Sequence, residues 1–245
     1  METKKPNTGK TIGILGGMGP LATADLYRKI ITLTKADCDR DHIRIYIDSN
    51  SAIPDRTGAI LHGGPDPVPE MTSALRHLEA CGADCIIMPC NTAHYFLPVL
   101  QEKTDVPFLD MLKITAARCA GRFPGKTAGI LATDGTVETG LYDRALTEAG
   151  VAFLHPEKAL QQTVMHLIYD VVKASRPIEP EREVWRALLE AFRGQGADYF
   201  ILGCTELPVL AATLDAEGPF VDPTEELARA AIRYCGYEVK EDSDA

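Results

Sequence analysis

The sequence predicts an α/β protein made of two pseudo-symmetric domains, each a parallel sheet flanked by helices, with the active site in the cleft between them. Two observations support this fold class. Apolar, strand-like runs alternate with segments of helical period, which is typical of parallel sheets, and segments of the first half of the chain recur in the second half. The 245 residues, 45% of them hydrophobic and 24% charged, suffice for one large or two small domains with substantial cores.

The first half contains the expected elements of a small parallel sheet. They are, in order, a strand over 11–15 (TIGIL), a glycine-rich loop over 16–20 (GGMGP), a helix over 21–36, a strand over 43–48 (IRIYID), a helix over 71–81 and a buried strand over 85–88 (CIIM). The last strand runs directly into Pro89, Cys90, Asn91 and Thr92. A polar segment therefore follows a buried strand without an intervening loop.

The second half repeats this order. Residues 127–133 (TAGILAT) echo 11–17 (TIGILGG) at an offset of 116 residues, and 196–198 (GAD) echo 82–84 (GAD) at an offset of 114. Extending the second match without a gap places Cys204 on Cys90, and 207–210 (LPVL) echoes 97–100 (LPVL) after a four-residue slip. The matches indicate an internal duplication whose period is too long for a solenoid.

The duplication predicts the domain boundaries. We expect an N-terminal α/β domain over 11–117 together with about 222–237, and a C-terminal α/β domain over 126–210. Residues 1–10 and the acidic end, 238–245, are expected to be disordered tails.

Charge and cysteine usage exclude several classes of protein. The formal charge of −10 argues against a general nucleic-acid binder or an acidic-membrane binder. No apolar run approaches the roughly 18 residues of a membrane span, and no signal-type apolar stretch follows the N-terminus. Seven cysteines without a CxxC pair make disulfide frameworks and zinc sites poor interpretations, so we expect no metal and a reducing, cytoplasmic location.

Cys90 and Cys204 are the strongest catalytic candidates, because each follows an apolar strand directly. Functional groups in open parallel sheets lie at the carboxyl ends of strands, so two facing halves would bring both thiols to one cleft. Inverting a stereocentre needs one group to remove a proton and another to deliver one to the opposite face. A nearby helix N-terminus would favour the thiolate form.

The other cysteines are interpreted as small core residues, since Cys85, for example, has Tyr199 as its repeat partner. Asn91, Thr92 and Thr205 supply hydrogen-bonding groups beside the two candidate thiols. Together with free backbone N–H groups, these side chains are expected to hold a substrate carboxylate.

Residues 88–94 (MPCNTAH) and 202–208 (LGCTELP) resemble the two cysteine motifs of the aspartate/glutamate racemase family. Residues 16–20 (GGMGP) and 53–57 (IPDRT) strengthen the resemblance and point to the aspartate racemase branch. The resemblance covers nearly the whole chain, from about Thr11 to Cys235. The resemblance implies a two-domain α/β fold, a small acidic amino acid as substrate, no cofactor and commonly a homodimer.

Two departures from glutamate racemases favour aspartate over glutamate. Glutamate racemases usually carry a histidine where this chain has Glu206, and their first glycine loop typically includes aspartate and serine where this chain has glycines. Glu206 could act near Cys204 or simply cap the following helix. His94, one helical turn beyond Cys90, could tune its thiolate, but a structural histidine is the favoured interpretation because no partner is visible.

Two cations are candidates for meeting the substrate charge. A guanidinium such as that of Arg56 can grip a carboxylate bidentately, and Lys173 closes a helical run over 161–173. On the residues alone, both could equally be surface cations. The resemblance favours a functional role for each.

The glycine loop containing Met18 is neither GxGxxG nor a P-loop. We expect it and its repeat partner, with Thr133 and Thr136 as hydrogen-bond donors, to line the shared cleft. Residues 62–67 (HGGPDP) could form a mobile lid or a plain surface connection.

Four rival functions stay open at this stage. A maleate-isomerase-like enzyme on the same scaffold also uses two cysteines, whereas a single-cysteine decarboxylase relative does not explain the second thiol. A non-catalytic binder of acidic amino acids has no need for matched thiols. A nicotinamide enzyme is the most distant alternative.

Overall fold

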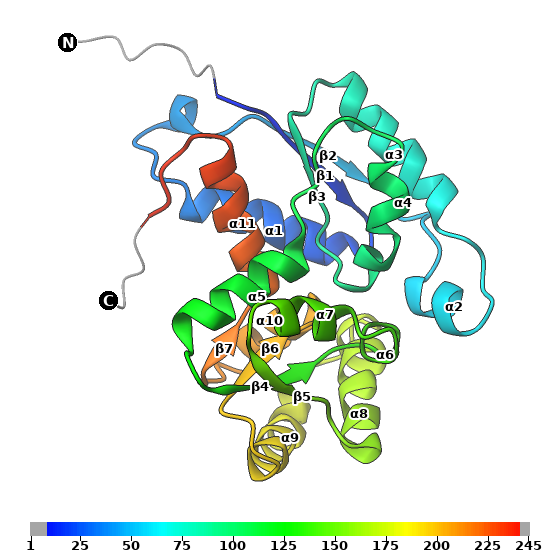
Figure 1. Ribbon diagram of the computed structural model, residues 1–245, viewed down its shortest axis with the longest axis vertical. Helices are drawn as coiled ribbons and strands as arrows, with labels where there is room; N and C mark the ends of the chain where they lie inside the picture. Colours follow the sequence, from blue (N-terminus) through cyan, green and yellow to red (C-terminus); the bar gives the residue numbers. More distant parts are fainter. Residues whose placement is uncertain (1–8, 241–245) are drawn as a thin grey trace.

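The computed structural model describes residues 9–240, which form two lobes, one above the other in Figure 1. The upper lobe contains a three-stranded sheet of order β2-β1-β3, and the lower lobe a four-stranded sheet of order β5-β4-β6-β7. All pairings within these two sheets are parallel, which confirms the predicted fold class. The strands are β1 (Ile12–Gly16), β2 (Ile45–Ser49), β3 (Cys85–Ile87), β4 (Thr127–Leu131), β5 (Ala152–Leu154), β6 (Tyr199–Leu202) and β7 (Phe220–Val221).

The two sheets have the same internal order, as the duplication predicts. In each, the first strand along the chain lies between the second and the third. Cys85 on β3 pairs with Ile12, and its repeat partner Tyr199 on β6 pairs with Ala128, so equivalent residues occupy equivalent register positions. The carboxyl ends of β3 and β6 therefore carry Cys90 and Cys204 at matching places.

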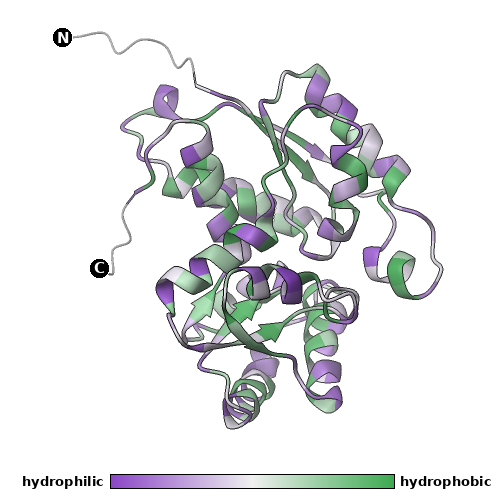
Figure 2. Cartoon of the chain, viewed as in Figure 1, coloured by the Kyte–Doolittle hydropathy of each residue, from purple (hydrophilic) through white to green (hydrophobic). Residues whose placement is uncertain are grey.

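Helices cover both faces of each sheet. They are α1 (Pro20–Leu33), α2 (Arg56–Leu61), α3 (Val68–Ala80), α4 (Leu97–Gln101), α5 (Met111–Arg122), α6 (Asp134–Glu138), α7 (Leu141–Glu148), α8 (Lys158–Met165), α9 (Arg182–Gly194), α10 (Glu206–Thr213) and α11 (Pro223–Tyr234), with 3₁₀ segments η1 (Asp39–Asp41), η2 (Thr92–Phe96) and η4 (Glu179–Glu181) and a π-helical segment η3 (His166–Val172). The helix α9 shows the usual cause of such packing, because Trp185, Leu188, Leu189 and Phe192 recur on one face and are buried. In Figure 2 the strands of both sheets are coloured mainly hydrophobic.

The helices α5 and α11 cross between the lobes. Each begins at an aspartate cap, Asp110 or Asp222, whose carboxylate accepts two backbone N–H groups of the first turn. The helix α11 follows the last strand of the lower sheet but packs on the upper one, where Leu227 joins a core containing Ile12 and Leu26. Figure 1 shows it beside α1, although the two helices lie at opposite ends of the chain.

The chain thus passes between the lobes twice, which bears on the predicted division into domains. Leu112 and Ala116 of α5 pack in the lower core, next to Ala128 and Ile130. We keep as a proposal a first domain of 11–117 with 222–237 and a second of 126–210, with α5 shared at their junction.

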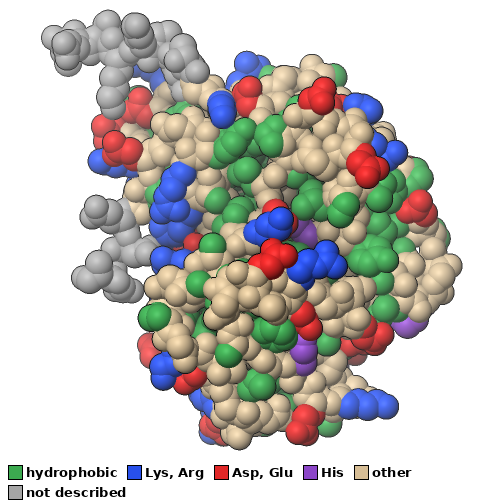
Figure 3. Space-filling model, viewed as in Figure 1, with side chains coloured by type: hydrophobic (Ala, Val, Ile, Leu, Met, Phe, Trp, Pro, Cys, Tyr) green, Lys and Arg blue, Asp and Glu red, His purple; other side chains and the backbone are tan. Residues whose placement is uncertain are grey.

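The ends of the described chain differ from one another. Residues 238–240 pair with residues 33–35 through backbone hydrogen bonds, so these three residues are part of the fold. Gly9 and Lys10, also predicted to belong to a tail, are described, and Nζ of Lys10 lies 3.9 Å from the ring centroid of Tyr234. The remaining segments predicted to be tails, 1–8 and 241–245, lie outside the described residues. Within residues 9–240, no helix is both long and apolar enough to cross a membrane. On the face shown in Figure 3, basic and acidic side chains are interspersed over both lobes.

Candidate active site

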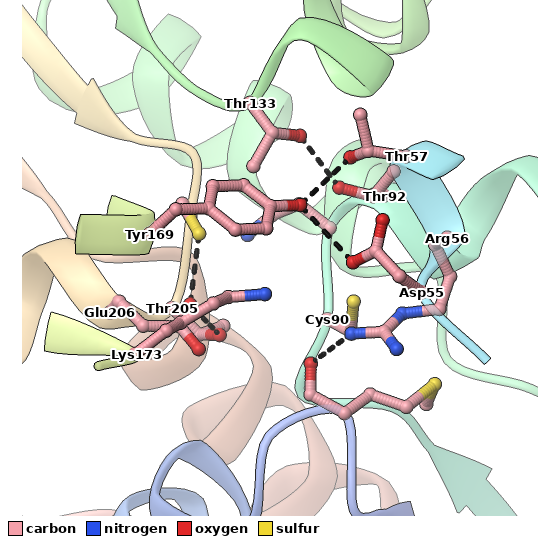
Figure 4. Close-up of a pocket in the computed structure, with 13 residues that line it drawn as sticks. Asp55, Arg56, Thr57, Cys90, Thr92, Thr133, Tyr169, Lys173, Thr205 and Glu206 are labelled. Atoms are coloured by element: carbon pink, nitrogen blue, oxygen red, sulfur yellow. Dashed lines mark hydrogen bonds between the residues drawn. The ribbon is translucent and has the colours of Figure 1, made fainter. Parts of the chain in front are cut away.

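A small cavity lies between the lobes, at the carboxyl ends of both sheets. Its volume is about 10 Å³, which is room for one water molecule. Figure 4 shows side chains entering it from both lobes. The lining residues are Met18, Asp55, Arg56, Thr57, Cys90, Asn91, Thr92, Thr133, Tyr169, Lys173, Cys204, Thr205 and Glu206.

Cys90 belongs to the upper lobe of Figure 1 and lines the cavity with Arg56 beside it. Arg56 is only 7% exposed, at the start of α2, where Asp55 caps the helix by accepting the N–H of Gly58. Its Nη2 donates to the carbonyl of Met18 over 2.6 Å, which fixes the guanidinium. Burial opposes the charge of Arg56, but Cys90 and then Asp55 raise its pKa above the ordinary value. The guanidinium is therefore a permanent cation beside the sulfur.

Cys204 belongs to the lower lobe and lines the same cavity. Its hydrogen-bond partner is a carboxylate. Its Sγ donates to Oε2 of Glu206 over 2.9 Å, and the hydroxyl of Thr205 donates to the same oxygen over 3.3 Å. Burial raises the pKa of Cys204 well above the ordinary thiol value, Glu206 raises it further, and Lys173 opposes the shift. Cys204 is therefore held as a thiol.

Tyr169 on η3 and Lys173, the residue that follows η3, both reach the cavity. This segment is π-helical, a geometry often found at functional sites, and it places Nζ of Lys173 over the Tyr169 ring, 4.5 Å from the centroid. Burial opposes the charge of Lys173, but Glu206, Cys204 and Tyr169 raise its pKa above the ordinary value. The cavity thus holds a second fixed cation, opposite Arg56 in Figure 4.

Tyr169 also joins the two lobes. Its hydroxyl lies 3.2 Å from Oδ1 of Asp55 and 3.2 Å from Oγ1 of Thr57, both carried by the upper lobe. Tyr169 additionally lines a larger groove of about 520 Å³ formed by α6, α8 and η3. Tyr169 therefore borders both the small cavity and this groove.

Three buried threonines form another link between the lobes. Oγ1 of Thr92 lies 2.9 Å from Oγ1 of both Thr133 and Thr136. Thr133 is also the N-cap of α6, where its side chain accepts the N–H of Thr136. Thr92 and Thr133 line the cavity, whereas Thr136 lies behind them.

His94 faces away from the Cys90 sulfur. Its Nε2 accepts the backbone N–H of Met111 over 3.1 Å, so Nδ1 carries the proton and donates to the carbonyl of Cys90 over 2.9 Å. Burial lowers the pKa of His94, which keeps the ring neutral. His94 ties the Cys90 loop to the start of α5, in line with the structural role favoured from the sequence.

The structure brings together nearly all of the site residues predicted from the sequence. Thr136 is the exception, and the loop over 62–67 contributes none of the lining. Asp55, Thr57 and Tyr169 also line the cavity and are not among the residues predicted from the sequence. Asp55 and Thr57 flank Arg56 in the IPDRT motif, and Tyr169 lies four residues before Lys173 in a helical run, so a signal for each was present.

Over residues 9–240, no group of three or more His, Cys, Asp or Glu side chains is placed to hold a metal ion. All seven cysteines are free thiols.

Comparison with known proteins gives consistent matches. The family model of Asp/Glu/hydantoin racemases matches residues 15–231. The chain is 30% identical over 238 residues to the broad specificity amino-acid racemase RacX of Bacillus subtilis, covering 93% of this chain and 99% of that protein. The structure of Picrophilus torridus aspartate racemase superposes with a TM-score of 0.79 at 30% identity, covering 95% of this chain and 96% of that one.

A glutamate racemase structure shares the fold at lower similarity. The enzyme from Francisella tularensis superposes with a TM-score of 0.63 at 17% identity, covering 92% of this chain and 80% of that one. The family model spans most of the chain, and the curated relative matches almost end to end. The chain therefore belongs to the Asp/Glu/hydantoin racemase family and is a racemase.

Proposed function

We propose that this enzyme racemises an acidic amino acid without a cofactor, converting L-aspartate to D-aspartate in preference to glutamate, with Cys90 and Cys204 as the acid/base pair. One observation carries the proposal. Two thiols at equivalent positions of duplicated halves line one cavity, together with the fixed cations Arg56 and Lys173.

The different surroundings of the two thiols assign their resting roles. Cys204 keeps its proton because burial and Glu206 disfavour its thiolate, so it is the acid. We assign Cys90, which lies beside the guanidinium of Arg56, as the base. In one direction Cys90 takes the Cα proton and Cys204 donates its own to the opposite face of the carbanion.

The reverse direction needs Cys204 as the base and a proton on Cys90, which is the form that a forward turnover leaves behind. Glu206 is placed to take the proton of Cys204, since its Oε2 already accepts the hydrogen bond from Sγ. After this transfer, Lys173 lies close enough to stabilise the thiolate, because its charge lowers the pKa of Cys204. Each thiol would thus serve one face of the substrate.

Positive charge and hydrogen-bond donors in the site stabilise the negative charge that forms when Cα loses its proton. Removing a proton beside a carboxylate builds negative charge that a preorganised site must stabilise. A substrate with two carboxylates suits two cations, so we assign Arg56 to the side-chain carboxylate and Lys173 to the α-carboxylate. We expect substrate binding to be completed by side-chain and backbone groups of Met18, Asn91, Thr92, Thr133, Thr205 and Glu206. Thr136 lies behind this lining and contacts Thr92 and Thr133.

Substrate entry requires the lobes to separate. A cavity of about 10 Å³ is far too small for an amino acid. The hydroxyl of Tyr169 bridges the lobes at the cavity edge, and we assign it to closing the site around substrate.

A broader substrate range is the second candidate. A relative at 30% identity is a broad specificity amino-acid racemase, whereas the structural relative at the same identity is an aspartate racemase. The cation pair favours acidic substrates, and the departures of the glycine loop and Glu206 from glutamate racemases favour aspartate.

The deciding experiment is chiral chromatography after incubation without added cofactor, in the presence of a chelator. The substrates are L- and D-aspartate, L- and D-glutamate, and alanine, lysine and arginine as neutral and basic comparisons. We expect aspartate to racemise fastest. Turnover of lysine or arginine at a similar rate would replace the acidic assignment by the broader one, and no turnover of any amino acid would refute the proposed function.

The remaining alternatives predict different isotope patterns in D₂O. A racemase incorporates solvent deuterium at Cα, whereas a binder does not, and a maleate-isomerase-like enzyme acts on maleate instead. We further propose a homodimer located in the cytoplasm, and light scattering of the purified protein tests the dimer directly.

A further inference from the structure

In the side-chain amide of Asn91, the oxygen has a hydrogen-bond partner among residues 9–240 and the nitrogen has none. Asn91 follows Cys90, is 2% exposed and lines the cavity. Its Oδ1 accepts a hydrogen bond of 2.7 Å from the hydroxyl of Tyr142. Its Nδ2 is buried and has no hydrogen-bond partner within residues 9–240. A buried donor without a partner is costly, so this N–H calls for an acceptor that arrives with the substrate.

Tyr142 approaches Asn91 from the other lobe and does not line the cavity. It lies on α7, is 1% exposed and packs in the lower core with Ala128 and Ile130. Burial raises its pKa well above the ordinary phenol value, so the hydroxyl keeps its proton and stays a donor. The ring is fixed by the core, which holds the hydroxyl oxygen 2.7 Å from Oδ1 of Asn91.

A carboxamide has one accepting end and one donating end. When Tyr142 donates to Oδ1, the amide cannot rotate by half a turn without placing its NH₂ group against the same hydroxyl. Nδ2 therefore stays on the side of the amide that faces away from Tyr142, and Asn91 itself lines the cavity. Apart from this hydroxyl, no hydrogen-bond partner of the Asn91 side chain among residues 9–240 distinguishes the two amide orientations.

We propose that Tyr142 is a positioning residue that orients the Asn91 amide so that Nδ2 donates to the substrate carboxylate as negative charge builds at Cα. This inference rests on the proposed function, because it assumes a carboxylate substrate between the thiols. A mere structural tie between the lobes would require the Tyr142 hydroxyl but not a free Nδ2 at the cavity. The test separates these two roles.

The kinetic test compares Tyr142→Phe, Asn91→Ala and the double variant with the wild type. Tyr142→Phe removes one oxygen from a fixed ring, and we expect kcat/KM to fall about tenfold, mainly through kcat. Asn91→Ala removes the donor itself, and we expect a loss of roughly 100-fold. The double variant should be no worse than Asn91→Ala, since the hydroxyl acts only through the amide.

Tyr199→Phe is the matched control. Tyr199 is equally buried in the lower core, and it does not line the cavity, so its variant should keep the wild-type kcat/KM. Wild-type kinetics in Tyr142→Phe, or losses that simply multiply in the double variant, overturn the inference. An inactive wild type instead refutes the proposed function, and the following measurement still tests the orientation of the amide.

Nuclear magnetic resonance reads the amide directly, because the chain contains only three asparagines, Asn7, Asn50 and Asn91. Labelling with ¹⁵N-asparagine therefore gives three side-chain amide pairs, and Asn91→Ala identifies one of them. Without substrate, we expect Tyr142→Phe to split or broaden the Asn91 pair and Tyr199→Phe to leave it unchanged. An Asn91 pair identical in wild type and Tyr142→Phe overturns the inference.

Two further experiments test the inference if the Tyr142→Phe variant does not fold. In the wild type, the Asn91 pair should shift on saturation with the racemic mixture of whichever amino acid is turned over, and an unmoved pair overturns the inference. Asn91→Asp keeps an acceptor for Tyr142 but turns an acceptor toward the cavity. It should lose at least as much activity as Asn91→Ala, and retained activity overturns the inference.

Discussion

Cys204 donates a hydrogen bond of 2.9 Å to Glu206, whereas its repeat partner Cys90 has the guanidinium of Arg56 beside it. The duplication has kept the thiol at both positions and changed the charge next to it. One sulfur therefore neighbours an anion and the other a cation. The site is symmetric in its reacting atoms and asymmetric in its resting charge.

The first prediction concerns the two thiols separately. Changing Cys90 or Cys204 to Ala should abolish net racemisation in both directions, because each turnover needs an acid and a base on opposite faces. The remaining thiol should still exchange the Cα proton of one enantiomer with solvent, without inversion. Mass spectrometry after incubation in D₂O, followed by chiral separation, should find opposite enantiomers labelled by the two variants.

Cys81→Ala is the control for this experiment, since Cys81 is exposed and lies outside the cavity. It should racemise like the wild type. Labelling of the same enantiomer by both active-site variants would contradict the assignment of one thiol to each face.

The second prediction concerns the pH dependence of Cys204. A neighbouring carboxylate disfavours a thiolate, and Glu206 accordingly raises the pKa of Cys204. In Glu206→Gln this contribution disappears while that of Lys173 stays, so the pKa should fall. Exchange by Cys204, isolated in the Cys90→Ala background, should therefore reach half its maximum at lower pH when Glu206→Gln is added. Its maximum should also be lower, because the proton acceptor is gone.

Glu190→Gln, an exposed change on α9, should leave this profile unchanged. A midpoint that stays in place or moves to higher pH in Glu206→Gln would show that Glu206 does not control Cys204. Steady-state kcat/KM cannot report the asymmetry, since two enantiomers have equal free energy in water and the ratio is therefore the same in both directions.

The third prediction concerns Arg56. Arg56→Ala removes a buried charge that holds the Met18 carbonyl and faces Cys90, and we expect kcat/KM for aspartate to fall by about 100-fold, or roughly 2–3 kcal/mol. Arg56→Lys should recover only part of this loss, because an ammonium cannot span the Met18 and Pro54 carbonyls as the guanidinium does. Steady-state kinetics with both enantiomers measure the effect. Unchanged aspartate kinetics in Arg56→Ala would remove Arg56 from the site.

The fourth prediction concerns the bridge formed by Tyr169. Tyr169→Phe keeps the ring under Lys173 but removes both contacts of the hydroxyl with the upper lobe. If these contacts stabilise the closed site by about 1 kcal/mol, their loss should lower kcat/KM about fivefold. Tyr95→Phe, at an exposed tyrosine outside the cavity, is the control and should behave as the wild type. Equal kcat/KM for Tyr169→Phe and wild type would mean that the hydroxyl does not contribute to closing the site.

Much of the site was predictable because it depends on the backbone pattern. In parallel sheets the residues after β3 and β6 must lie at the same edge, so the spacing of Cys90 and Cys204 in the repeat was enough to place them. Arg56 was predictable from its motif, but its two carbonyl partners depend on the loop geometry around Met18.

Residues whose role depends on side-chain direction were not predictable in the same way. Tyr169 lies four residues before Lys173, so a helix places both on one face, but the sequence does not indicate that this face turns toward the cavity. Thr136 was placed in the cleft by its repeat position, yet the cap at Thr133 turns it behind the lining. The crossing of α5 and α11 also has no local signal, because a helix sequence does not specify which sheet it will cover.

The return of α11 to the upper lobe has a consequence for how the protein is made. Leu227, Ala228, Ala231 and Ile232 are fully buried against strands and helices from the start of the chain, and each of the two large side chains contributes about 1.5–3 kcal/mol to that core. During synthesis the lower sheet is complete before these residues leave the ribosome, whereas the upper core lacks one of its walls until they do. The part of the protein that is translated first is thus the part that finishes folding last.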